Sequence, residues 1–562
     1  MLEIILIWIL TGMLALLWGG LLDSLTGKFF AEGRVNIWLR FWSGLAVLSF
    51  FLGIATFFTP LTPLVKGILW TALLLPGFLK GQLFFSLVRE IFQKLRSLPL
   101  VSWILLFVSM GISLLKASGR PEIFDEGAYH LPLIRMWENQ GLVMGMANLN
   151  GHYGLNSTWH ILSAFTNLSF LPFWKTEMSL NSLVAVVLGM YSATRVRNIL
   201  NGSRLVSHWI VVFLPFLVFR NLLSSPSTDI PAIICTWFVL THWLETIEKE
   251  ESPWQIWPAF VVLPIWIVIL KTSSAALLFI PAGALYLAVQ EESWVRIRWM
   301  MLFGCLLLAP WILQNWLITG YAVFPIRNTA IGHPAWQVPI EAIDKKFYLS
   351  QFGDFAPPSS YTWGWFLQWI RAQNTDSRMI ILLSFTTLIS GLAIFSFLRR
   401  QRNIITIFLY LSVLALVLSW FLTITEPRYG FGALVFSALF PVGYFLSKIS
   451  ARWKWAKFAA VSVLFLQGFN LMKTIRELPS EPIGVMFPAP VPLVKYQNYA
   501  CGNFMAIVPV AYLSEVPSDK PVFCWDCPFP CVPLEGIEDA GHIYQYRVIS
   551  GLVTNIGNHI PE

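Results

Sequence analysis

Residues 98–117 read LPLVSWILLFVSMGISLLKA, a stretch of twenty residues with a single charged side chain, Lys116. About 20 apolar residues are enough to cross a bilayer as a helix. Similar stretches recur along the 562-residue chain, which is 56% hydrophobic, 12% charged and contains 27 Trp. Because soluble domains carry about 25% charged residues, the sequence predicts an all-α polytopic membrane protein.

Fourteen membrane spans are predicted from the lengths of these apolar stretches. Residues 157–173 are also apolar but short and interrupted, so we expect an interfacial or re-entrant helix there. The first stretch begins with Glu3 and lacks a small-residue cleavage site, which favours a retained span over a signal peptide. The predicted spans are 2–22, 37–58, 61–79, 98–117, 180–198, 206–223, 229–247, 255–271, 273–289, 298–318, 378–398, 404–423, 429–447 and 457–474.

Basic residues gather in loops that fall on one side of the membrane if 157–173 does not cross it. Lys and Arg favour the cytoplasmic side, so we expect these loops in the cytoplasm and both termini outside. The net charge of +8 is then explained by the basic residues that set the orientation in the membrane. The sequence contains no basic run interleaved with aromatic residues, so it gives no sign of nucleic-acid binding. The loops contain Lys28, Arg34 and Arg40; Lys80, Arg89, Lys94 and Arg96; Arg195, Arg197 and Arg204; Arg399, Arg400 and Arg402; and Lys448, Arg452, Lys454 and Lys457.

Three large elements then lie on the outer face. They are loop 118–156, loop 319–377 and a tail, 475–562, that follows the transmembrane domain 1–474. The tail starts with proline-rich sequence, which is typical of an extended leader. Because the tail is small for an independent core, we expect it to pack on the outer loops.

The six cysteines divide between spans and tail. Cys235 and Cys305 lie in predicted spans and are most simply packing residues. On an oxidising face, the tail cysteines predict up to two disulfides, with three possible connectivities, and a zinc site is the alternative. The tail cysteines are Cys501, Cys524, Cys527 and Cys531.

The chemically most informative residues follow the 98–117 span. Residues 124–130 read FDEGAYH and place the adjacent carboxylates Asp125 and Glu126 at the mouth of the first large outer loop. Carboxylates near lipid are costly unless they face water, a partner or a ligand. On a helix, Glu126 and His130 share a face. The pattern favours a catalytic site, and a helix N-terminal cap at Asp125 is the alternative.

A second carboxylate, Asp229, lies in the segment Ser225–Pro231 at the predicted outer mouth of another span. It is either a helix cap or a partner of Asp125 across a cavity. In the second case the two carboxylates would share a divalent metal, Mg or Mn, or orient an acceptor.

Two basic residues lie at predicted outer ends of spans, where the positive-inside tendency disfavours them. An anionic ligand would explain Lys271 and Arg428, since Arg binds phosphate bidentately and Lys acts as a point charge. Snorkelling is the alternative for Lys271. Further candidates for substrate binding in the outer loops are Tyr129, Asn148, His152, Asn156 and Arg327.

With these residues in place, the chain resembles the GT-C superfamily of integral-membrane glycosyltransferases. Those enzymes combine many spans, an acidic motif in the first large outer loop, a second acidic residue in a later loop, and basic residues that hold a lipid-linked phosphate. Over about 118–535 the chain also resembles a family of bacterial polytopic membrane proteins. The matching motifs are Asp125-x-Gly127-x-Tyr129-His130, Asn148-Leu-Asn-Gly151, Gly154-Leu-Asn156-Ser157, Ser225-Pro-Ser-Thr-Asp229, Pro427-Arg428-Tyr429-Gly430 and Cys524-Trp-Asp-x-Pro-x-Pro-Cys531.

This resemblance implies a GT-C fold in a bacterial inner membrane and a polyprenyl-phosphate sugar as donor. The acceptor would be a glycan, a lipid or a protein. Asp125 would take the proton of the acceptor hydroxyl, while Glu126, His130 and Asp229 would orient the acceptor or a metal. Lys271 and Arg428 would neutralise the leaving phosphate, in a single displacement that inverts the anomeric centre.

The resemblance also implies a Cys524–Cys531 disulfide, which would leave Cys501 to pair with Cys527, a cysteine that departs from the family pattern. Two alternative functions stay open. One is a flippase or transporter for a lipid-linked saccharide, and the other is a polysaccharide polymerase or ligase. Transporters bind substrate near the midplane between repeated halves; here the polar residues cluster at the outer mouths without a visible repeat, which favours an enzyme.

Overall fold

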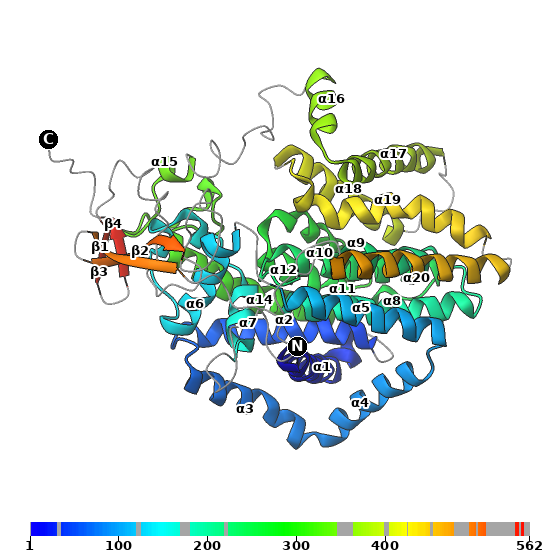
Figure 1. Ribbon diagram of the computed structural model, residues 1–562, viewed down its shortest axis with the longest axis horizontal. Coiled ribbons are helices and arrows are strands. Elements are labelled where there is room, and N and C mark those ends of the chain that lie inside the picture. Colours follow the sequence, from blue (N-terminus) through cyan, green and yellow to red (C-terminus); the bar gives the residue numbers. More distant parts are fainter. Residues whose placement is uncertain are drawn as a thin grey trace.

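A computed structural model gives the arrangement of the chain (Figure 1). It describes residues 2–30, 35–119, 125–168, 180–218, 223–344, 363–397, 404–423, 425–449, 453–476, 494–501, 504–512, 546–549 and 552–555. Up to residue 476 the described chain is mainly helical, and four short strands lie in the tail.

The α-helices follow one another along the chain with short turns or loops between them. The first group is α1 Leu2–Phe30, α2 Ile37–Ala55, α3 Pro63–Leu79, α4 Gly81–Arg96, α5 Leu100–Ala117, α6 Leu131–Asn139 and α7 Thr158–Thr166. The second group is α8 Leu180–Leu200, α9 Val206–Val218, α10 Asp229–Glu248, α11 Trp257–Phe260, α12 Val262–Leu270, α13 Phe279–Gln290 and α14 Trp294–Thr319. The third group is α15 Ile340–Ile343, α16 Trp363–Ala372, α17 Thr375–Phe397, α18 Ile404–Thr423, α19 Pro427–Ile449 and α20 Trp453–Arg476.

Short helical turns and strands complete the described chain. The turns are η1 Glu126–His130, which is π-helical, and the 3₁₀ turns η2 Met146–Asn148, η3 Gly151–Gly154, η4 Pro253–Ile256, η5 Thr272–Leu278 and η6 Arg327–Thr329. The strands form two antiparallel pairs, β1 Val494–Cys501 with β2 Phe504–Tyr512 and β3 Tyr546–Ile549 with β4 Leu552–Asn555.

Within the described residues, ten helical segments are long and apolar enough to cross a membrane, or eleven if the bent pair α3–α4 is one span. The protein is therefore a multi-pass membrane protein. The ten coincide with ten of the fourteen predicted spans. The other four predicted spans fall on α3, on α9 with its thirteen residues, and on α17 and α20. Whether those four cross the membrane stays a prediction, as does the orientation of the termini.

The loop expected at 80–96 is a helix in the structure. α3 and α4 meet at an angle of 90°, and Lys80 between them has a non-helical backbone (φ −113°, ψ 50°). Pro76 near the end of α3 weakens helix continuation, because proline lacks the N–H that the ladder needs. The basic residues of this segment therefore lie on an ordered helix, α4, whose Glu90 pairs with Arg40 of α2 at 3.1 Å.

The centre of the bundle is formed by α10 and by α12 with the turns before it. In each of these two segments, 89% of the apolar 18-residue stretch is buried inside the protein. The corresponding share is 28% in the segment that contains α13 and in α18. α10 and α19 pack closely, since Trp237 Nε1 donates to the carbonyl of Gly432 at 3.0 Å. A Cβ at Gly432 would lie 3.1 Å from the methyl carbon of Thr236, so only glycine fits there comfortably. Small residues allow such close approach between membrane helices.

Parts of loop 118–156, of loop 319–377 and of the tail gather at one end of the bundle, where Figure 1 shows α6, α15 and the four strands. Asn148 Nδ2 donates to the carbonyl of Trp336 at 2.8 Å, which joins the first large loop to the second. β4 lies against η2, in agreement with the expected packing of the tail on the outer loops. The pairing of Cys524, Cys527 and Cys531 lies outside the described residues, as does the side chain of Cys501.

Residues 157–173 do not form a long helix in their described part. α7 has nine residues, all of them buried, and packs against α2 and α6. At 1.5 Å per residue it is about 13 Å long, too short to cross a bilayer. A short helix is therefore present, and its interfacial or re-entrant position stays a prediction. Cys235 on α10 is a buried free thiol, as expected of a packing residue. Cys305 on α14 is a free thiol that is exposed on the protein surface, so the packing expectation does not hold for it.

Candidate active site

The carboxylate of Asp125 contacts a residue 303 positions away in the sequence. Arg428 Nη1 donates to Asp125 Oδ2 at 3.0 Å. Asp125 occupies the N-cap position of η1, but its side chain makes no capping hydrogen bond there. The capping interpretation therefore does not account for this side chain.

The guanidinium of Arg428 is held on three sides. Besides Asp125, its Nε lies 2.8 Å from Glu426 Oε1, and its Nη2 donates to the hydroxyl of Tyr429 at 3.1 Å. Tyr429 belongs to the motif around Arg428 and Glu426 immediately precedes that motif, but neither was predicted to have a role. Both residues are next to, or two positions from, an arginine at the start of a predicted span, and this position could have indicated their role.

The second carboxylate, Asp229, forms an ion pair with Lys271, and both side chains are mostly buried. Asp229 begins α10, where Thr228 is the N-cap and makes no side-chain capping bond. Lys271 follows α12 in an extended conformation (φ −153°, ψ 109°). These two residues therefore interact with each other, rather than serving as a simple cap and a snorkelling lysine.

Tyr429 connects the two ion pairs. The Nζ of Lys271 lies 4.0 Å from the centroid of the Tyr429 ring, and the guanidinium carbon of Arg428 lies 4.9 Å from the same centroid. Cations are attracted to the face of an aromatic ring. Burial, and after it the charge of Arg428, hold the pKa of the Lys271 ammonium well below its usual value, although the carboxylates of Asp125 and Glu426 raise it. Four of the charged residues expected to form the site, Asp125, Asp229, Lys271 and Arg428, thus lie in one electrostatic cluster.

A small cavity of about 30 Å³ adjoins this cluster. Its walls include Asp229, Lys271, Arg428, Tyr429 and the hydroxyl-bearing Ser273. A water molecule needs roughly 10–15 Å³ of such volume, so about two waters fit. A sugar would require side chains to move.

A pair of buried histidines lies behind the cluster. His130 Nδ1 is 2.8 Å from His160 Nε2. Burial lowers the pKa of His130 well below its usual value of 6.5, and the positive charge of Lys271 lowers it further. Burial alone lowers the pKa of His160 to about 3. Both rings are therefore neutral at pH 7, and His130 can hydrogen-bond but cannot supply a positive charge.

The ring of Tyr129 lies between two imidazoles. Its centroid is 4.1 Å from that of His130 and 5.0 Å from that of His152, with which it stacks. Burial and the nearby charge of Asp125 raise the pKa of the Tyr129 hydroxyl. Tyr129 and His152 therefore pack beside the cluster as neutral aromatic groups.

The family model described as "Domain of unknown function (DUF8201)" matches residues 1–435. The chain belongs to this family. The match includes Asp125, Asp229, Lys271 and Arg428 and ends before the tail. No curated protein and no solved structure matches the chain.

Other candidate residues of this DUF8201 member hold loops and helices together. Asn148 joins loop 118–156 to loop 319–377, and Asn156 Nδ2 donates to Gln314 Oε1 of α14 at 3.2 Å. Arg327 pairs with Asp344 within its own loop. Glu126 is fully buried and is not among the residues that line the cavity. A substrate or catalytic role for these four stays a prediction.

Few side chains in the described part of this DUF8201 member are placed to bind a metal ion together. Within the described residues, no group of three or more His, Cys, Asp or Glu side chains is placed to hold a metal ion. Asp125 and Asp229 each face a cation. A divalent metal bound by these two carboxylates stays a prediction.

Proposed function

We propose that this protein is a membrane glycosyltransferase of the GT-C type. It would transfer a sugar from a polyprenyl phosphate to a glycan, lipid or protein acceptor at the outer leaflet of a bacterial inner membrane. The observation that supports it is the meeting of two carboxylates and two cations around Tyr429. These groups come from four separate segments, namely the N-cap of η1, the start of α10, the residue after α12 and the start of α19.

The cations fit the leaving group of such a reaction. A sugar linked to a polyprenyl phosphate carries one negative charge, and departure of the lipid phosphate creates a second one. Positioned cations stabilise charge that develops in a transition state. Arg428 and Lys271 would share this task, and their contacts with the ring of Tyr429 support the proposal.

Donor binding would also release the base. In the observed arrangement Asp125 accepts a hydrogen bond from Arg428. A phosphate that binds Arg428 competes with this carboxylate and frees it for the acceptor. The acceptor oxygen then bonds to the anomeric carbon while the bond from that carbon to the phosphate oxygen breaks. The electron pair leaves with the phosphate, and Asp125 takes the hydroxyl proton.

The remaining groups would position the acceptor. Asp229 can accept a hydrogen bond from an acceptor hydroxyl once phosphate has drawn Lys271 away from it. His130 is neutral and hydrogen-bonded to His160, so it would fix the turn that carries Asp125. It is a positioning residue in this scheme.

The test is the substitution Asp125→Asn, which keeps the size of the side chain and removes its basicity. In a strain that lacks the gene, wild-type protein should restore one envelope sugar unit, measured by mass spectrometry, and Asp125→Asn should not. Glu291→Gln is the matched control, since Glu291 also pairs with an arginine, Arg296, after α13. Sugar transfer by purified Asp125→Asn protein would refute the assignment.

A further inference from the structure

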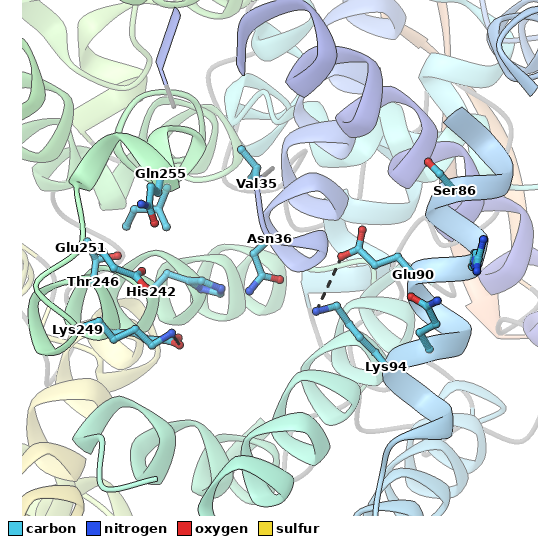
Figure 2. A pocket seen from close by; sticks show the side chains of 14 residues that line it. Val35, Asn36, Ser86, Glu90, Lys94, His242, Thr246, Lys249, Glu251 and Gln255 are labelled. Carbon is cyan, nitrogen blue, oxygen red and sulfur yellow. Dashed lines mark ion pairs between the residues drawn. The ribbon is translucent and has the colours of Figure 1, made fainter. Parts of the chain in front are cut away.

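A second and larger cavity lies at the opposite end of the bundle from the candidate active site. Its volume is about 660 Å³. It is bounded by α4, the residues before α2, the last turns of α10, and η4 (Figure 2). α10 begins at Asp229 and ends at Glu248. A helix of that length extends over about 30 Å, so the two sites are separate.

Two helices supply most of the cavity wall. On α4, Ser86, Arg89, Glu90 and Gln93 line it, and their spacing of three and four residues places them on one helical face. Figure 2 shows Glu90 and Lys94 on this side, with the end of α10 across the cavity.

Three cations and three carboxylates line the cavity, but two of the carboxylates are also bound by arginines that lie outside the lining. Glu245 is already paired with Arg195 at 2.6 Å and with Lys249 at 2.8 Å. Glu90 is paired with Arg40. Arg89 forms no ion pair within the described part of the chain.

Lys94 shows the same imbalance. It lies 3.9 Å from Glu90, and the charges of Arg40, Arg195 and Arg197 also act on it. Among the residues lining the cavity, the remaining carboxylate, Glu251, is exposed. An anion beside Arg89 and Lys94 would relieve this repulsion, as expected of a basic pocket between membrane helices.

A buried nitrogen of His242 without a hydrogen-bond partner indicates that the ligand of this cavity carries a hydrogen-bond donor as well as a negative charge. His242 lines the cavity, and its ring extends toward Asn36 (Figure 2). Its Nδ1 lies 2.8 Å from the carbonyl oxygen of Phe238, and since a carbonyl only accepts, Nδ1 carries the proton. In the neutral ring, Nε2 is then an acceptor, and it has no hydrogen-bond partner within the described residues. A hydroxyl donor can supply one.

We propose that this cavity binds a phosphorylated polyol. Arg89 and Lys94 hold the phosphate, and a hydroxyl donates to His242. The volume falls in the range of small-molecule sites, roughly 300–1,000 Å³. Further amide and hydroxyl groups that can bind the polyol are those of Asn36, Ser86, Gln93, Thr246 and Gln255.

Such a group can come from a soluble sugar phosphate or from the headgroup of a glycerophospholipid. α4 presents Phe85 and Phe92 to the outside, 72% and 68% exposed. These rings lie on the same helix as Arg89, where the acyl chains of a lipid bound by its headgroup would run.

The experiment uses the full chain in nanodiscs of phosphatidylcholine. One arm titrates glucose 6-phosphate by isothermal calorimetry. The other uses nanodiscs that contain phosphatidylglycerol and detects retained lipid by native mass spectrometry. We expect binding in at least one arm, and Arg89→Ala should weaken it at least tenfold. Arg96→Ala, on the same helix but outside the cavity lining, should leave it unchanged.

His242→Gln provides an independent readout. If glucose 6-phosphate binds, this variant should bind it more weakly and bind inorganic phosphate as the wild type does, since only the sugar phosphate offers a hydroxyl. Should His242→Gln fail to fold, the comparison of Arg89→Ala with Arg96→Ala still decides the matter. The proposal is overturned if neither probe binds, or if both arginine variants lose binding equally. It does not depend on the glycosyltransferase proposal.

Discussion

The ammonium of Lys271 lies 4.0 Å from the centroid of the Tyr429 ring, and the hydroxyl of the same ring accepts a hydrogen bond from Arg428. One tyrosine thus contacts both cations of the candidate site, one through its face and one through its oxygen. The two ion pairs form a single unit through this ring, and its parts can be separated by substitution.

Tyr429→Phe should lower sugar transfer less than Tyr429→Ala does. Phenylalanine keeps the ring face that attracts Lys271 and loses the hydrogen bond to Arg428, whereas alanine loses both. Restoration of the envelope glycan in a strain without the gene measures the difference. Equal activity of the two variants would show that the ring face contributes nothing.

Arg428→Lys should lower transfer more than tenfold. A lysine ammonium cannot contact Asp125, Glu426 and Tyr429 at the same time, because it lacks the planar fork of the guanidinium. The protein level in the membrane should stay close to that of the wild type. Arg296→Lys, in the Arg296–Glu291 pair, is the control and should transfer normally.

Removal of one partner of the Asp229–Lys271 pair should destabilise the protein by about 1–3 kcal/mol, because a mostly buried charge then loses its partner. The double variant Asp229→Asn/Lys271→Met should cost less than the sum of the single changes. Thermal unfolding of the purified protein measures both effects. The same cycle at the more exposed Arg327–Asp344 pair should give a coupling of less than about 1 kcal/mol.

Stability should fall as the pH drops below about 6.5. His130 and His160 have lowered pKa values in the folded protein, about 3 for His160. Between that value and 6.5 the unfolded chain binds more protons than the folded one, and linkage then makes unfolding easier as pH falls. Each such group contributes at most about 1.4 kcal/mol per pH unit.

The measurement is the melting temperature from pH 7 to pH 5. His160→Gln should flatten its decline with falling pH, since one of the two groups no longer titrates. A substitution at exposed His333 should leave the slope as it is. An unchanged slope in His160→Gln would contradict the neutral imidazole pair.

Helix positions were predictable because an apolar run of membrane length admits little besides a helix. All fourteen predicted spans fall on helices. The segment 80–96 was misjudged as a loop, since its basic residues resemble an orientation signal. The polar residues at positions 86, 89, 90 and 93 share one helical face, and this pattern indicates a helix once the amphipathic period is considered.

The charged members of the candidate site were predictable because Asp125, Asp229, Lys271 and Arg428 stand beside apolar runs, where charge is costly. The sequence did not predict which carboxylate pairs with which cation, because each pair joins residues that are far apart in the chain. His160 was missed inside an apolar segment, where a buried imidazole leaves no pattern in the sequence.

Gly432 lies one helical turn beyond Arg428 and lets α19 rest directly on Thr236 of α10. Because glycine has no side chain, the helix that begins with Asp229 and the helix that begins with Pro427 can approach each other closely at this point. The close packing at Gly432 thus helps to set the distance between the charged groups at the ends of these helices, although Gly432 itself has no reactive group.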